Sequence, residues 1–253
     1  MKATLFGAIP TSSVMAVIGQ FDPFTRLHAD LMRQLGVEAR QQGKTPVAIL
    51  FEPDIRAVLY GPGRWPAYDD AVIKRRLIAT EGVDTVLQVA CDRSDLQSGA
   101  REVFDLVCDT VPLADLWLGH HQRLGSGDPG SIETTQQEAD RHGVQITRLP
   151  QVEILPFMNK VRMLLGQGKV DIAARHIGRH PRRVRVPRID VDWAPGIYSV
   201  LGHRDDGQAI PLEIEFKRIP EGRSAAPWPD PDYPMITFLS GPADTGSGAV
   251  AAD

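Results

Sequence analysis

The chain has 253 residues, 42% of them hydrophobic and 24% charged, and a formal net charge of −4. A chain of this length can bury a sizeable core and suggests one large domain, or one domain with a small companion. The acidic balance argues against non-specific nucleic-acid binding, and no apolar run approaches the roughly 20 residues that a membrane-spanning helix requires. We therefore expect neither nucleic acid nor a membrane among the partners.

The two cysteines and the N-terminal segment bear on the cellular compartment. Cys91 and Cys108 lack the close spacing of a metal site, so we expect two reduced thiols in a cytoplasmic protein. Residues 1–11 carry one lysine, a short apolar stretch and no clear cleavage site. They are interpreted as a leader strand or a disordered start rather than as a signal peptide.

Apolar runs alternate with helical patterns from residue 14 to residue 149. The runs predict five strands, at residues 14–19, 46–51, 85–89, 114–118 and 144–149. Between them, apolar residues at helical spacing predict helices at residues 25–42, 68–81, 98–110 and 132–142. Strands that alternate with helices indicate an α/β fold with a Rossmann-like, doubly wound parallel sheet of five strands.

Side-chain patterns place some of these segments within the fold. The continuous apolar run at residues 46–51 is typical of a strand buried on both faces, whereas residues 144–149 alternate and are expected near an edge. In the helix predicted at residues 68–81, the apolar residues are expected to face inward and the basic residues outward. Residues 59–65, with two glycines and a proline, are expected to form a loop.

The rest of the chain has weaker patterns. Two further helices are predicted at residues 158–168 and 170–177, followed by a basic, proline-broken linker at residues 179–188. Weak alternation on both sides of a turn indicates a β-hairpin within residues 196–216. Residues 241–253 are rich in small residues and are expected to be disordered.

Three predicted strands are followed by segments suited to binding a ligand. In a doubly wound sheet, ligands bind beyond the carboxyl ends of the strands, where the strand order reverses. Residues 19–28, 51–54 and 119–127 each follow a predicted strand. We therefore expect these three segments to rim one crevice.

The segment from Gly19 to His28 combines a strand end, a glycine turn and the start of a helix. Pro23 fixes its own φ and favours an extended conformation at Asp22. Thr25 and His28 then lie at the start of the first predicted helix. Backbone N–H groups and the helix dipole at such a start favour a phosphate, and a Thr or His side chain can complete the contact. The segment therefore predicts an anion site.

The pattern Gly19-x-Phe-Asp-Pro-x-Thr-x-x-His28 resembles the first motif of the HIGH-type nucleotidyltransferase superfamily. Later segments fall in the order and spacing of the bacterial bifunctional FAD synthetase family (riboflavin kinase/FMN adenylyltransferase). These segments are Phe51-Glu52-Pro53, Glu81-Gly-Val-Asp84, Leu118-Gly-His-His-Gln-Arg-Leu-Gly125, Leu164-Leu-Gly-Gln-Gly168 and Ala173-Ala-Arg-His-Ile-Gly-Arg179. The resemblance covers about residues 14–180, which correspond to the adenylyltransferase module.

The resemblance implies an adenylyltransferase that uses ATP, or another nucleoside triphosphate, with Mg²⁺ and a phosphorylated small-molecule acceptor; in that family FMN becomes FAD. It implies catalytic roles for Thr25, His28, Lys160 and Arg162. Expected at the nucleotide are Gly19, Phe21, Asp22, Gly119, Arg123, Gly125 and Asn159, and expected at the acceptor are Phe51, Glu52 and Pro53. Such a transfer requires positioning and the stabilisation of phosphoryl charge rather than an acid–base dyad.

One cluster of side chains looks like a metal site. His120, His121 and Asp128 are close in sequence, but adjacent histidines point in different directions, so no metal site is predicted. We favour a nucleotide-facing loop centred on Arg123 and Gly125.

Three places depart from the family pattern. Thr25 stands where the family usually has histidine, although related transferases also have threonine at this position. Leu27 stands where the family has glycine. A leucine at a helix start narrows the room for backbone close to a phosphate. In the segment that aligns with the family's Ser-Ser-Thr-x-x-Arg loop, Phe157 and Met158 replace two hydroxyl residues, while Arg162 keeps the arginine. We therefore expect a cationic grip on the triphosphate with fewer hydroxyl donors.

The C-terminal part is expected to form a small β-containing extension. Gly196-Ile-Tyr198 is similar to a strand of the family's kinase barrel, but the chain lacks the Gly-x-Pro-Thr-Ala-Asn segment that kinase activity requires. The predicted organisation is a nucleotidyltransferase-like domain at residues 1–183, a remnant of a kinase-type barrel at residues 184–240 and a disordered tail at residues 241–253.

Three hypotheses follow. The leading one is a nucleotidyltransferase of the FAD synthetase type without a working riboflavin kinase, which transfers AMP from ATP to FMN and releases pyrophosphate. A second keeps the fold but changes the nucleotide or the acceptor, or cleaves a dinucleotide. A third is a non-catalytic nucleotide-binding protein, motivated by the lost hydroxyls and by Leu27.

Overall fold

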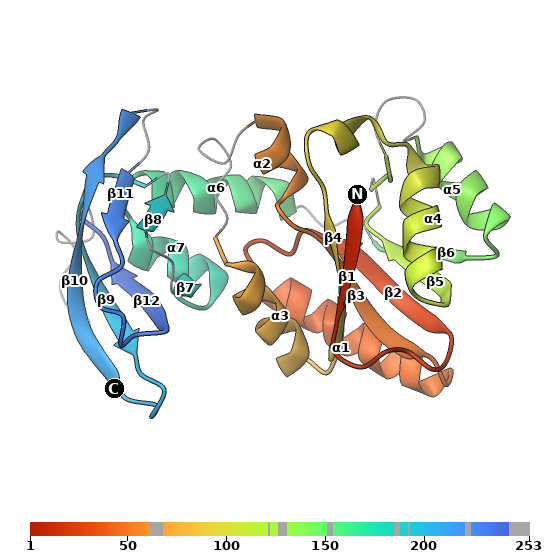
Figure 1. Cartoon of the computed structure of the whole chain (residues 1–253), viewed down its shortest axis with the longest axis horizontal. Coiled ribbons are helices and arrows are strands. Elements are labelled where there is room, and N and C mark those ends of the chain that lie inside the picture. Colours follow the sequence, from red (N-terminus) through yellow and green to blue (C-terminus); the bar gives the residue numbers. More distant parts are fainter. Residues whose placement is uncertain are drawn as a thin grey trace. The chain divides into compact units, whose positions relative to one another are not determined.

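The computed structural model describes residues 1–60, 68–120, 122–125, 131–150, 154–184, 188–191, 193–220 and 224–242. The chain forms two compact units, each with its own sheet (Figure 1). Each unit also has its own buried core. The first unit consists of Met1–Phe21, Arg26–Leu59 and Lys74–Val152, and the second of Asp22–Thr25, Tyr60–Ile73 and Glu153–Asp253.

The first unit is built on a six-stranded sheet in the order β1-β4-β3-β2-β5-β6. Its strands are β1 (Lys2–Phe6), β2 (Val14–Gly19), β3 (Thr45–Phe51), β4 (Thr85–Ala90), β5 (Leu113–Leu118) and β6 (Gln145–Arg148). Strands β2 to β6 run parallel, whereas β1 pairs antiparallel with β4. The predicted α/β class and parallel sheet are confirmed, and the N-terminal segment adds an antiparallel edge strand to the five that were expected.

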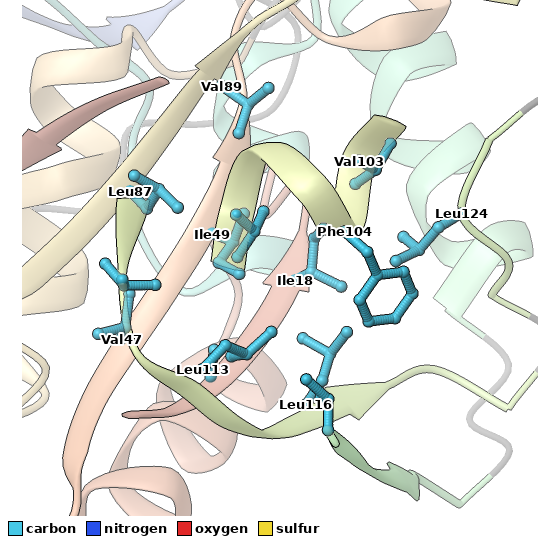
Figure 2. Close-up of a cluster of buried hydrophobic side chains, with 14 of the residues drawn as sticks. Ile18, Val47, Ile49, Leu87, Val89, Val103, Phe104, Leu113, Leu116 and Leu124 are labelled. Atoms are coloured by element: carbon cyan, nitrogen blue, oxygen red, sulfur yellow. The ribbon is translucent and has the colours of Figure 1, made fainter. Parts of the chain in front are cut away.

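Helices cover both faces of this sheet, because alternate strand residues point to opposite faces. Ile18, Ile49 and Leu116 lie in one buried cluster with Phe104 of α4 (Ala100–Thr110), as Figure 2 shows. The intervening residues of β2, such as Val17, point the other way, and α1 (Arg26–Gln41) packs there against β2 and β3. Ala139 of α5 (Ile132–Arg141) joins the first cluster.

Two segments between β3 and β4 differ from the sequence-based expectation. A short helix, α2 (Ile55–Tyr60), occupies the start of the predicted loop, and residues 61–67 lie outside the described part of the chain. The predicted helix at residues 68–81 is shorter, as α3 (Ala71–Thr80). Its basic residues do not all face outward, because Lys74 is only 1% exposed and pairs with Glu52.

The second unit combines two helices with an antiparallel sheet in the order β7-β12-β9-β10-β11-β8. Its elements are α6 (Ile154–Gly166), α7 (Val170–Ile177), β7 (Arg182–Val184), β8 (Arg188–Val191), β9 (Gly196–His203), β10 (Ala209–Arg218), β11 (Ser224–Pro227) and β12 (Met235–Ser240). Val161 and Ile177 from the helices share one core with Trp193, Tyr198 and Phe238 from the sheet region. The helices therefore belong to the same compact unit as the C-terminal sheet.

The hairpin predicted within residues 196–216 is confirmed by the pairing of β9 with β10. The interpretation of residues 179–188 as a linker is wrong in part: β7 and β8 are strands of the second sheet, and the Arg183 side chain is buried. The predicted tail lies outside the described residues from position 243 onward. In the described part of the chain, no helix has both the length and the apolar character to cross a membrane.

Candidate functional site

A pocket opens at the carboxyl ends of the parallel strands in the first unit. The strand order reverses here, because β2 lies between β3 and β5. The lining residues come from the carboxyl ends of β2 and β3, from the segments that follow β2, β3, β4 and β5, from α4 and from the N-terminus: Gly19, Gln20, Phe51, Ile55, Cys91, Asp95, Ser98, Gln122, Arg123, Leu124, Gly125, Val103 and Met1. The three segments that were expected to rim one crevice all contribute to this strand-end pocket. Its free volume is about 140 Å³, and a single water needs about 10–15 Å³, so a ring-sized group fits.

The walls of the strand-end pocket are largely apolar, and Asp95 and Arg123 add charged side chains. Phe51, Val103 and Leu124 are buried there. Burial, together with the nearby Asp95 carboxylate, raises the pKa of the Cys91 thiol, which therefore stays neutral at physiological pH. Gln20 Oε1 is buried and has no hydrogen-bond partner in the described part of the chain. An unsatisfied buried acceptor costs about 1–3 kcal/mol, so a ligand that donates an N–H to Gln20 would recover this cost.

The first half of the motif is shaped by an aromatic ring that folds back over the strand end. Phe21 has a φ of +46°, which is uncommon for a residue other than glycine. A methyl carbon at Gly19 would lie 2.8 Å from the Phe21 ring, so a larger residue would have to displace that ring. The Phe21 ring also meets His28 edge to face, with 5.4 Å between the centroids. Phe21 therefore packs against the His28 imidazole.

The segment after β5 is held by hydrogen bonds between backbone groups and the side chains of Gln122 and Arg148. The Gly119 N–H donates to Gln122 Oε1 at 3.1 Å, and Arg148 donates to the carbonyl oxygens of both residues. Burial lowers the pKa of Arg148. Gly125 has a φ of +84°, and a methyl carbon there would lie 2.4 Å from the backbone N of Ala100. Gly125 is thus required for close packing against the start of α4.

The predicted acceptor segment contains a buried ion pair. The Glu52 N–H donates to the Val89 carbonyl oxygen at 3.0 Å and extends the ladder between β3 and β4. The Glu52 carboxylate accepts from the Lys74 ammonium, and the two side chains are 22% and 1% exposed. Glu52 therefore presents a carboxylate whose charge is offset by Lys74, next to the Phe51 wall of the pocket.

Residues Asp22–Thr25 of the motif belong to the second unit, whereas His28 lies in the first. The Asp22 carboxylate accepts the backbone N–H groups of Tyr68 at 3.0 Å and of Asp69 at 2.9 Å. The Tyr68 N–H contacts both carboxylate oxygens, so the two N–H groups make three contacts that commit most of the lone pairs of Asp22. Thr25, which precedes α1, is only 6% exposed.

The segment that aligns with the family's hydroxyl-rich loop lies within a helix. Because α6 begins at Ile154, this segment is not at the helix N-terminus. Phe157 packs against the core of the second unit, with its ring edge to face with His176 at 6.2 Å. Asn159 and Lys160 are exposed, and Arg162 Nη2 donates to the Asp22 carbonyl oxygen at 3.2 Å. The helix α6 thus carries two cationic side chains, Lys160 and Arg162, whereas Phe157 contributes packing.

The family model described as FAD synthetase matches residues 8–156, more than half of the chain. The chain belongs to the FAD synthetase family. The matched segment spans β2 to β6 and all of the residues that line the strand-end pocket, apart from Met1. The resemblance inferred from the motif at Gly19–His28 is therefore confirmed at the level of the family.

Curated relatives match part of the chain. It is 30% identical over 142 residues to the bifunctional riboflavin kinase/FMN adenylyltransferase of Escherichia coli K12, a match that covers 54% of this chain and 44% of that protein. It is 26% identical over 169 residues to the protein of the same name from Pseudomonas fluorescens, which covers 65% and 54% respectively. The chain thus spans about half the length of these FAD synthetase relatives.

A solved structure matches over nearly the whole chain. It is a crystal structure described as a macrolide-efflux protein from Streptococcus pneumoniae, with a TM-score of 0.65 and 20% identity. The match covers 92% of this chain and 86% of that one. At this identity the similarity concerns the fold, and it includes the C-terminal region as well as the FAD synthetase segment.

The structure places the predicted ligand residues in three groups. Gly19, Phe51, Arg123 and Gly125 line the strand-end pocket. Phe21, His28, Glu52, Pro53 and Gly119 lie in the first unit outside the pocket lining. Asp22, Thr25, Asn159, Lys160 and Arg162 lie in the second unit. Their roles toward a nucleotide or an acceptor stay predictions.

Sequence reasoning missed Gln20, Lys74, Asp69 and Arg179. Gln20 occupies the variable position of the motif, so the pattern says nothing about it. Lys74 is four residues before the buried Ile78 on the same helix face, a spacing that could have indicated an inward side chain. The partnership of Asp69 with Arg179 spans 110 positions and leaves no local signal.

Proposed function

We propose that this FAD synthetase family member is an adenylyltransferase, which moves AMP from ATP to a phosphorylated acceptor and releases pyrophosphate. FMN is the acceptor proposed first, because the curated relatives are named FMN adenylyltransferases. The observation that carries the proposal is the strand-end pocket, in which the motif glycine Gly19 meets Phe51 and Arg123 within the family-matched segment. Its position at the reversal of strand order is where doubly wound folds bind ligands.

In this reaction an acceptor phosphate oxygen attacks the α-phosphorus of ATP, and the bond to the pyrophosphate oxygen breaks. Charge spreads over the phosphoryl oxygens, so catalysis depends on fixed donors and cations. We assign the donors to Thr25, which directly precedes α1, and to His28 in the first turn of α1. The Phe21 ring packs edge to face against the His28 imidazole.

The second set of groups is on α6. Arg162 and the exposed Lys160 are proposed to stabilise the negative charge of the triphosphate, and Asn159 is proposed to donate to it. Because this segment lies inside the helix, side chains rather than free backbone N–H groups would make these contacts.

The acceptor is proposed to bind along Phe51, Glu52 and Pro53, with a ring-sized part in the strand-end pocket. Mg²⁺ is placed with ATP as part of the substrate, because Mg²⁺ binds through substrate phosphates, water and one or two carboxylates. Within the described ranges, no three His, Cys, Asp or Glu side chains come together as a metal-ligand group.

A second candidate is a nucleotide-binding protein without turnover. The packing of Phe157 against His176 and the second core favours it, because this position contributes no phosphate donor. The two candidates share the pocket and differ in whether pyrophosphate is released.

The test uses the purified full chain with Mg²⁺, ATP or CTP, and a panel of phosphorylated acceptors that includes FMN, and it measures pyrophosphate. Turnover of FMN to FAD supports the adenylyltransferase. Tight nucleotide binding by calorimetry without pyrophosphate from any acceptor supports the binding protein.

His28→Ala tests the site assignment. We expect turnover to fall about 100-fold or more, as on removal of one preorganised charge-stabilising donor. His203→Ala is the matched control, since His203 bonds Thr237 within the second sheet. Equal turnover in both variants would show that His28 is not part of the site.

A further inference from the structure

The backbone of Phe24 is held on both of its polar groups by side chains from distant parts of the sequence. Its N–H donates to Asp69 Oδ2 at 3.3 Å, and its carbonyl oxygen accepts from Arg179 Nη2 at 3.2 Å. All three residues lie in the second unit, and Phe24 is only 4% exposed. We call this set of contacts the Phe24 clamp.

The two side chains of the Phe24 clamp also bind each other. Arg179 Nη1 donates to Asp69 Oδ1 at 2.8 Å, and Arg179 Nη2 donates to Asp69 Oδ2, so the pair is bidentate. The Asp69 side chain is fully buried and that of Arg179 is 18% exposed. A bidentate pair of this kind is rigid, because the planar guanidinium matches the carboxylate in one orientation.

Further contacts hold the clamp in place. The Asp22 carboxylate accepts the N–H of Asp69, so the motif also fixes the residue that grips Phe24. The Tyr68 hydroxyl donates to the Arg179 carbonyl oxygen at 3.2 Å. Burial raises the pKa of Tyr68, which keeps its hydroxyl protonated as a donor.

The clamp acts on the peptide that leads into Thr25. The carbonyl of Phe24 and the N–H of Thr25 belong to one planar peptide unit and point in opposite directions. Arg179 holds that carbonyl, so it also sets the direction of the Thr25 N–H and the position of the Thr25 side chain. An error of about 1 Å in such a group can reduce catalysis about 100-fold.

We infer that Asp69 and Arg179 are positioning residues for nucleotidyl transfer: they orient the Phe24–Thr25 peptide and thereby place Thr25 at the phosphates. This inference rests on the proposed function. It adds two residues that the motif does not contain, and it gives Asp22 a role in holding the clamp.

The test compares Arg179→Lys and Asp69→Asn with the wild type. Lysine keeps a positive charge but cannot grip the carboxylate and the Phe24 carbonyl in the same planar geometry. We expect kcat to fall about 30-fold in Arg179→Lys, with KM for ATP raised by less than about threefold. Because both residues act through one contact set, the double variant should lose little more than Arg179→Lys alone.

A matched control separates positioning from general stability. Asp115→Asn removes an ion pair with Lys44 in the first unit. Asp115 lies in the first half of β5, away from the carboxyl ends of the strands where the pocket opens. We expect it to lower Tm about as much as the clamp variants and to leave kcat within about twofold. If the clamp variants match this control in kcat, the inference is wrong.

A milder variant and a binding measurement cover the remaining outcomes. Tyr68→Phe removes one hydroxyl from the clamp and should reduce kcat about threefold if Arg179→Lys does not fold. If the wild type binds ATP but releases no pyrophosphate, the proposed transferase function fails, and the clamp is judged by the ATP Kd, which should rise about twofold in Arg179→Lys. Unchanged Kd there, or a wild type that neither binds nor turns over ATP, overturns the inference.

Discussion

The strand-end pocket and the Phe24 clamp contain different residues of the same ten-residue motif. Gly19 belongs to the pocket, where Gln20 Oε1 is buried without a hydrogen-bond partner in the described part of the chain. Asp22 supports the clamp, because its carboxylate accepts backbone N–H groups from Tyr68 and Asp69. The pocket thus leaves a polar group for a ligand, whereas the clamp uses its carboxylates to hold the chain.

This difference shows that the type of a polar residue does not decide its role. A carboxylate can bind a ligand or cap a turn, and both roles satisfy it equally well. What separates the roles is whether the protein itself supplies the partners. For Asp22 those partners come from Tyr68 and Asp69, more than 40 positions away in sequence.

The largest expected effect concerns Gly125, at which the pocket rim packs closely against the residues that begin α4. Gly125→Ala combines a positive φ with a contact of 2.4 Å to the backbone N of Ala100. We expect a loss of about 3 kcal/mol or more. For a chain of this size that lowers Tm by roughly 6–12 °C, as thermal unfolding would measure.

Gly119→Ala is the control, because a methyl carbon there would lie 3.5 Å from Gln122 Oε1, an ordinary contact distance. It should shift Tm by no more than about 2 °C. Similar Tm values for the two variants would mean that the backbone at Gly125 can shift to accommodate a methyl group, and that the pocket rim is not rigidly packed there.

The parallel sheet could be predicted from the sequence because its signal is local. Each buried strand, such as residues 46–51, is a continuous apolar run, and each helix repeats every three to four residues. The edge strand β1 was left open, because a short segment with exposed positions resembles an irregular start.

The arrangement of the candidate site could be predicted only in part. The strand-end rule of doubly wound sheets brought Gly19, Phe51 and Arg123 together correctly. The buried pairs Lys74–Glu52 and Arg179–Asp69 could not be found, because their partners are distant in sequence and either member alone suits an exposed surface.

The next effect concerns the strand-end pocket, where Gln20 Oε1 has no hydrogen-bond partner in the described part of the chain. Gln20→Leu removes the buried acceptor that lacks a partner, so Tm should stay the same or rise slightly. Ligand affinity should fall about tenfold, equivalent to about 1.4 kcal/mol, because the N–H donor of the ligand loses its acceptor. Calorimetry with ATP and with FMN would show which ligand depends on Gln20.

Gln136→Leu serves as the control for this change, because Gln136 is exposed on α5 and bonds Asp140. It should leave both affinities within about twofold. If Gln20→Leu also leaves both affinities unchanged, the pocket does not receive the donor edge of either ligand.

The smallest effect is expected at Lys160, which is exposed on α6 and therefore acts through water. A solvated ammonium contributes little at a distance, because salt screens charges beyond about 8 Å at physiological ionic strength. We expect Lys160→Ala to lower kcat/KM about two- to fivefold in low salt, to lose this effect at high salt, and to keep Tm within about 1 °C. Lys217→Ala, on the exposed side of β10, should change neither value. A loss of about 100-fold at Lys160 would instead mean that its ammonium contacts the phosphates directly, so that α6 supplies a ligand group where the Phe24 clamp supplies only position.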